Sequence, residues 1–76
     1  MRLAFDANKL LKAGYEYAVV IRHARSLTVP AGTLISKHRT YDAACNSPGA
    51  RASDTEIIDL VQAARDQIID GWGSAP

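Results

Sequence analysis

The sequence predicts an α+β domain, in which a three-stranded antiparallel sheet is packed by a short helix and an amphipathic C-terminal helix. Three observations predict this class: residues 15–23 alternate as a strand does, residues 27–39 hold two β-prone segments around a turn, and residues 53–72 carry an apolar stripe at helical spacing. The 76 residues suffice for one small domain, 1–76. Residues 73–76, "GSAP", are expected to fray.

The N-terminal elements follow from local signals. Asp6 is placed to cap a short helix that contains Leu10 and Leu11, and Gly14 is placed to end it. The strand at 15–23 comes next, and a turn with Pro30 and Gly32 joins two further strands within residues 27–29 and 34–39. The sequence therefore predicts a meander of three strands that are consecutive along the chain.

Two helices are expected after the meander. Thr40 is placed to cap the first, which presents Tyr41, Ala44 and Cys45 to the sheet. Ser53 and Glu56 match the S-x-x-E capping box, which predicts that the last helix begins at Ser53. Its apolar stripe consists of Ile57, Leu60, Val61, Ala64, Ile68 and Trp72.

Charge is unevenly distributed along the chain. Residues 1–51 contain eight Lys or Arg and three Asp or Glu, a balance of +5, whereas residues 52–76 contain one Arg and five acids, a balance of −4. Such asymmetry indicates either a basic binding face, or two segments that attract each other within the fold or across a dimer.

Signals for catalysis and for metal or cofactor binding are missing. The conventional candidates are His23, His38, Asp42 and Cys45, and no pair of them has the compact spacing of a zinc site. The five glycines form no phosphate-binding loop. We therefore expect a protein that is not an enzyme, with no metal and no cofactor.

A basic edge is the main candidate for a binding site. One group of side chains follows the first predicted strand and another ends the third, so in a meander the two groups would meet at one edge of the sheet. The basic edge consists of Arg22, His23, Arg25, Lys37, His38 and Arg39. Such an edge neutralises phosphates, and Tyr15 or Tyr17 is available for stacking. The alternative interpretation is a solvated set of strand ends.

The predicted order of three strands and a helix opened by "RTYDAA" resembles the arm-type DNA-binding domains of phage integrases over residues 15–47. The resemblance implies a small DNA-binding domain that lays its sheet into the major groove. The chain departs from that pattern, because residues 15–47 contain no tryptophan and no run of strand-borne arginines. In its length and lack of motifs the chain is also similar to small phage inhibitors of bacterial defence systems, including CRISPR.

These observations predict a small non-enzymatic binding protein that acts by occupancy. Through the basic edge it would engage a nucleic-acid-handling protein or nucleic acid, as a phage or mobile-element inhibitor of a defence system such as CRISPR does. The alternatives are the integrase-like DNA-binding domain and a homodimer formed through the C-terminal helix by Ile57, Val61, Ile68 and Trp72. No apolar run reaches the roughly 18 residues of a membrane span. A lone cysteine and the lack of a secretory signal predict a cytoplasmic location.

Overall fold

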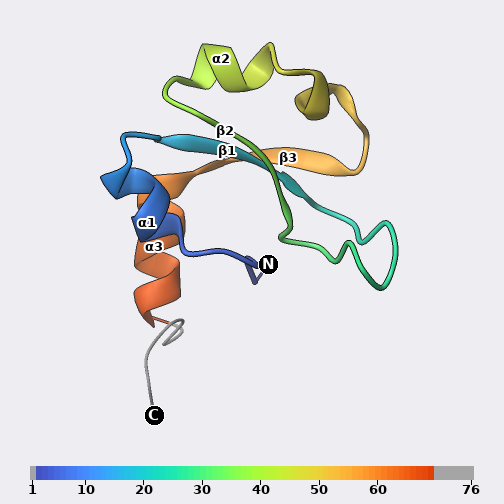
Figure 1. The fold of residues 1–76 in the computed structure, drawn as a ribbon, viewed down its shortest axis with the longest axis horizontal. Helices are drawn as coiled ribbons and strands as arrows, with labels where there is room; N and C mark the ends of the chain where they lie inside the picture. Colours follow the sequence, from blue (N-terminus) through green and yellow to red (C-terminus); the bar gives the residue numbers. More distant parts are fainter. Residues whose placement is uncertain (1, 70–76) are drawn as a thin grey trace.

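The fold is a three-stranded antiparallel sheet with helices on both faces (Figure 1). The structure is a computed structural model, and it describes residues 2–69. The elements in chain order are α1 (Ala7–Lys12), β1 (Tyr17–Ile21), β2 (Leu34–His38), α2 (Tyr41–Cys45), the 3-10 helix η1 (Pro48–Arg51), β3 (Thr55–Asp59) and α3 (Leu60–Ile69). The predicted α+β class, with its sheet, short helix and C-terminal helix, is confirmed. Trp72 and the predicted tail at 73–76 lie outside the described residues.

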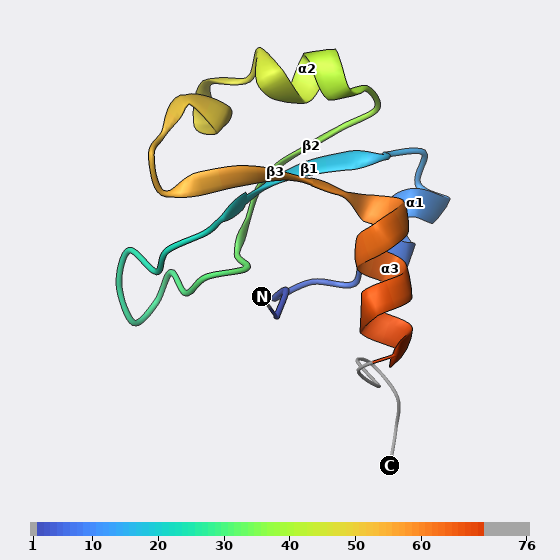
Figure 2. The ribbon, with the colours of Figure 1, turned by 180° about the vertical axis from the view of Figure 1, so that it is seen from behind.

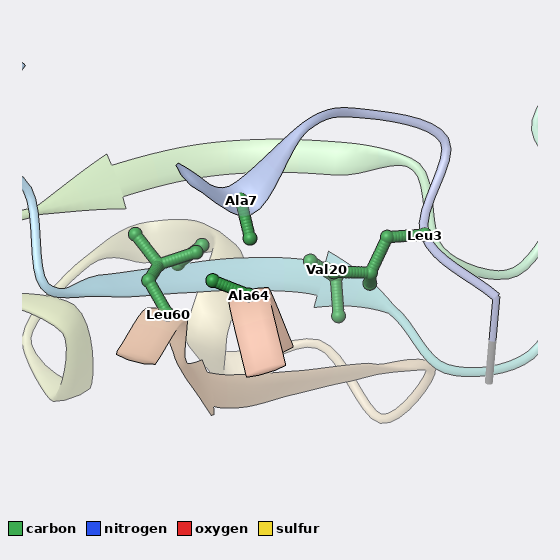
Figure 3. Close-up of a cluster of buried hydrophobic side chains, with 6 residues drawn as sticks. Leu3, Ala7, Val20, Leu60 and Ala64 are labelled. Carbon is green, nitrogen blue, oxygen red and sulfur yellow. The ribbon is translucent and has the colours of Figure 1, made fainter. Parts of the chain in front are cut away.

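The central strand β1 is buried on both faces. Helices α1 and α3 cover one face, and α2 with η1 covers the other (Figures 1 and 2). Ala18 and Val20 of β1 pack on the first face against Leu3, Ala7, Leu60 and Ala64 (Figure 3). Since Ala18, Val19, Val20 and Ile21 are all fully buried, β1 reads as a continuous apolar run.

Three predicted helix boundaries are confirmed, at Asp6, Gly14 and Thr40. The Asp6 side chain accepts a hydrogen bond from the Asn8 amide at the start of α1, and Gly14 has a φ of +97° just after that helix. The Thr40 side chain accepts from the Ala43 amide at 3.1 Å and so caps α2. Each signal acts within a few residues of the element that it bounds.

The prediction of a strand at 27–29 is wrong. Strand β2 pairs directly with β1, with Tyr17 opposite His38 and Val20 opposite Leu34, and residues 22–33 form the long connection between them. Its tip closes on itself, because the Arg25 amide donates to the Val29 carbonyl and the Val29 amide donates to the Ser26 carbonyl. The β-prone side chains at 27–29 therefore have no place in the sheet.

The third strand comes from the segment that was predicted to start the last helix. Residues Thr55–Asp59 form β3 and pair with β1, with Val19 opposite Ile57, and α3 begins only at Leu60. The Ser53–Glu56 capping box is therefore wrong, and the Asp59 side chain instead accepts from the Val61 amide at 2.9 Å. Since α2 precedes this strand, the order that resembled integrase arm-type domains does not occur.

The prediction that three side chains of α2 pack on the sheet holds fully for Ala44 and only in part for Tyr41, which is 55% exposed. Ala44 is buried, and the Tyr41 ring contacts the Tyr17 ring edge to face with centroids 5.6 Å apart. Cys45 is exposed rather than directed at the sheet. The helix has only five residues, so it presents a narrow contact surface. No helix within residues 2–69 is long and apolar enough to cross a membrane.

Candidate functional site

The register of the sheet separates the two groups of the predicted basic edge. Arg22, His23 and Arg25 follow the last residue of β1, whereas Lys37 and its neighbours lie beside the first residues of β1, because His38 is opposite Tyr17. β1 has five residues, and at roughly 3.4 Å per residue the two groups are about 15 Å apart along the strand. The predicted convergence is therefore wrong.

The group at the end of β1 fastens the chain that leads into β3. The Arg25 guanidinium donates to both carboxylate oxygens of Asp54, and Arg22 Nη2 donates to the Ser53 carbonyl at 2.9 Å. The Arg25 hydrogen bond lowers the pKa of the Asp54 carboxyl, and the same bond raises the pKa of Arg25. Beside them, the exposed His23 directs its amide to the Asp54 carbonyl. Arg22 and Arg25 therefore stabilise the fold at this position by binding the chain before β3.

The group at the end of β2 forms an exposed cluster on one aromatic ring. Lys37 Nζ lies 4.9 Å and Arg39 Cζ lies 5.4 Å from the centroid of the Tyr15 ring. Lys37 lies on β2 and Arg39 directly follows the last residue of that strand, so the two cations, two residues apart, reach the same ring. We call Tyr15, Lys37 and Arg39 the cationic patch. Cation–π contacts at exposed positions are worth about 0.5–1 kcal/mol each.

A glycine allows the arginine of the patch to lie against the chain. Gly14 has a positive φ, and a Cβ built on it would lie 3.1 Å from Arg39 Nη1. A larger residue would therefore be strained and would also crowd the guanidinium. Within residues 2–69 the structure shows one ion pair, Arg25 with Asp54, so the patch has no carboxylate within ion-pairing distance there.

His38 faces the other side of the sheet from the patch. Its Nε2 lies 2.8 Å from Ser36 Oγ, a contact that the sequence analysis missed although both residues point to one face at strand spacing. A serine beside a histidine suits nucleophilic chemistry only when a third group orients the ring. No carboxylate among the described residues hydrogen bonds to His38, and residues 2–69 contain no group of three metal-ligating side chains.

The predicted partner helix is divided between two elements. Ile57 lies on β3 and is half-buried, whereas Val61 and Ile68 lie on α3, where 41% and 76% of their surfaces are exposed. Ile69, which the sequence analysis left out, is 81% exposed. The face of α3 that points to the core carries Leu60, Ala64 and Gln67 instead.

Comparison with known proteins adds no relative: no family model, no curated protein and no solved structure matches the chain.

Proposed function

We propose that the protein is a non-enzymatic binding protein that acts by occupancy and engages an acidic partner through the cationic patch. The partner is nucleic acid or an acidic surface of a protein that handles nucleic acid. The observation that carries the proposal is the pairing of two exposed cations, Lys37 and Arg39, on the Tyr15 ring, where neither forms an ion pair with a carboxylate of the described chain. Like charges held close together repel, and an acidic partner removes that cost.

The patch is also organised before a partner arrives. The Tyr15 ring contacts the Arg39 guanidinium and the lack of a Cβ at Gly14 leaves room for it, so less ordering of this side chain is needed on binding. A guanidinium binds phosphate or carboxylate with two parallel hydrogen bonds, whereas the lysine ammonium acts as a point charge. Such a surface needs no catalytic group, which suits an inhibitor that blocks nucleic-acid-handling machinery such as a bacterial defence system.

A paired charge reversal tests this proposal. Lys37→Glu with Arg39→Glu should weaken binding to labelled single-stranded DNA, duplex DNA and polyglutamate more than Arg51→Glu with Arg65→Glu does. Both double variants change the net charge by the same amount, and Arg51 and Arg65 are exposed and lie outside the patch. Fluorescence anisotropy across a salt series measures the affinities, with circular dichroism as the folding control.

The salt series separates the kinds of partner. For duplex DNA the slope of log affinity against log salt should be about −0.9 per phosphate contact, and loss of one contacting side chain should flatten it by about one. For an acidic protein surface we expect a shallower dependence that appears mainly in the association rate. Equal losses from the two double variants would show that only total charge matters and would contradict the proposal.

A second candidate function is homo-oligomerisation through α3, which the exposure of Val61, Ile68 and Ile69 favours. Val61 and Ile68 are seven residues apart on α3 and so lie on one face of the helix. Exposed apolar side chains grouped on one helix face are typical of a contact surface. Changing Val61 and Ile68 to serine should then lower the molecular mass measured by sedimentation. That contact would persist in concentrated salt, because apolar burial is not screened.

A further inference from the structure

The charge asymmetry of the sequence becomes an asymmetry across the sheet. The sheet order is β2-β1-β3, so the strand from the basic part of the chain and the strand from the acidic part form opposite edges (Figure 1). Lys37 and Arg39 mark the β2 edge, and Glu56 and Asp59 mark the β3 edge. β1, which lies between them, carries no charged side chain.

Little of this charge is neutralised inside the described molecule. The one ion pair within residues 2–69 joins Arg25 to Asp54, away from the charges at the two edges. Lys37 is opposite Ala18 and Glu56 is opposite Val20, so both side chains lie on the same face of the sheet with β1 between them. Edge strands separated by one strand are roughly 10 Å apart, which equals the screening length at about 0.1 M salt.

We propose that the basic β2 edge of one copy pairs with the acidic β3 edge of a second copy of this chain. β2 and β3 each run antiparallel to β1, so they run parallel to each other. A second copy placed beside the first in the same orientation therefore continues the sheet in the order β2-β1-β3-β2-β1-β3. Lys37 is level with Ala18 of β1, and Glu56 is level with Val20, so a shift of two residues along the strands brings the side chains of Lys37 and Glu56 together on one face of the junction. The two edge strands are matched in length, with five residues each.

Charge selects this junction over the two symmetric ones. Pairing of two β2 edges would bring Lys37 and Arg39 against the same cations, and pairing of two β3 edges would bring Glu56 and Asp59 against the same acids. Like charges across neighbouring strands are destabilising, and opposite charges are stabilising. A lysine on an edge strand generally opposes pairing with another strand. Lys37 would therefore repel a second basic edge but attract an acidic one.

The junction has two consequences. Because it joins different surfaces of the two copies, it leaves one free edge at each end and builds open chains rather than closed dimers. It also occupies Lys37 and Arg39, so self-association and an external acidic partner compete for the cationic patch. The inference uses the same patch as the proposed function but needs no external partner, and each is tested on its own.

Charge swapping with the purified full chain tests the inference by sedimentation velocity over a concentration series at low and high salt. The average mass should rise with concentration at low salt and fall in concentrated salt. Lys37→Glu or Glu56→Lys alone should weaken association about 2- to 30-fold, since one attractive pair becomes repulsive. An equimolar mixture of the two variants should regain association, because each then offers edges of one sign to the other.

Circular dichroism of each variant shows whether it has folded, and the mixture tests the contact with proteins that carry one substitution each. Association that survives both single reversals, or a mixture that does not associate, would overturn the inference. So would a protein that stays monomeric at every concentration in low salt. Val61→Ser combined with Ile68→Ser should leave this association unchanged. If that double substitution abolishes the association, the contact is formed by α3 instead.

Discussion

A buried carboxamide joins the first helix to the last. Gln67 Oε1 accepts from the Ala7 amide at 2.9 Å, and Gln67 Nε2 donates to the Phe5 carbonyl at 2.6 Å. Only 8% of Gln67 and none of Ala7 is exposed to solvent. The first amides of a helix have no partner within it, so the side chain supplies one. Gln67→Leu would keep most of the packing and remove both hydrogen bonds.

The expected loss of stability follows from the two main-chain groups left behind. A buried donor or acceptor without a partner costs about 1–3 kcal/mol, so the pair should cost about 2–4 kcal/mol, allowing for some access of water. A chain of 76 residues has a free energy of unfolding of about 4–11 kcal/mol. The substitution should therefore remove about a third to a half of it and lower Tm by about 10–30 °C.

Urea and thermal unfolding, followed by circular dichroism, measure this loss against a matched control. Gln62→Leu makes the same chemical change on the exposed side of α3, where Gln62 Nε2 donates to Asp66 Oδ1 at 3.0 Å. That control should cost less than about 0.5 kcal/mol. If both variants unfold at the same urea concentration, the carboxamide does not join the helices and the reasoning is refuted.

Three further predictions use the same unfolding assays. Thr40→Ala should lower the free energy of unfolding by about 0.5–2 kcal/mol, because Thr40 caps α2. Ser53→Ala, at the position that the sequence predicted as the cap of the last helix, should lower it by less than about 0.5 kcal/mol. The reverse ranking would contradict the start of α3 at Leu60. Gly32→Ala should destabilise strongly, because Gly32 has a φ of +90° and the new Cβ would lie 2.2 Å from the Arg2 carbonyl oxygen; near-normal stability would show that the close approach is absent. Arg25 lowers the pKa of Asp54, so this ion pair stabilises the fold above the unfolded-state pKa of about 3.9 and its contribution is lost as pH falls through the lower folded value. Arg25→Gln should make stability less dependent on pH in that acid range, and an unchanged profile would count against the pair.

The parts of the fold that the sequence predicted depend on short-range signals. The caps at Asp6 and Thr40 and the glycine after α1 act on amides or dihedral angles within a few residues. The strand β1 was also predicted, although as an alternating strand over 15–23, whereas the observed strand covers Tyr17–Ile21 and is buried on both faces, as a central strand is. Such signals locate an element without saying what it pairs with.

The third strand was missed because two patterns overlap in one segment. Ser53 and Glu56 have the spacing of a capping box, and Ile57, Leu60 and Val61 have helical spacing, yet Thr55–Asp59 is also β-prone. Pairing with β1 decides between them, since Val19 opposite Ile57 joins residues far apart in the chain. Tertiary contact of this kind overrides local propensity and leaves no mark in a short window of sequence.

The mistaken strand at 27–29 accounts for the wrong prediction of the basic edge. A meander of consecutive strands would have returned Lys37 toward Arg22, whereas the observed hairpin of β1 and β2 places them at opposite ends. Residue types were sufficient to select Lys37 and Arg39 as candidates, but their common contact with Tyr15 depends on the register of β2.

Topology also decides what the uneven charge of the sequence can do. Had the three strands been consecutive, the acidic C-terminal part would have entered no edge of the sheet, and its charge would have lain on a helix. Because β3 comes from that part and pairs with the far side of β1, Glu56 and Lys37 are held apart by an uncharged strand. The basic edge of one molecule can then attract the acidic edge of another molecule, as well as the acidic part of its own chain. Reversal of a single edge charge is therefore the most direct way to separate a solvated surface from a contact surface.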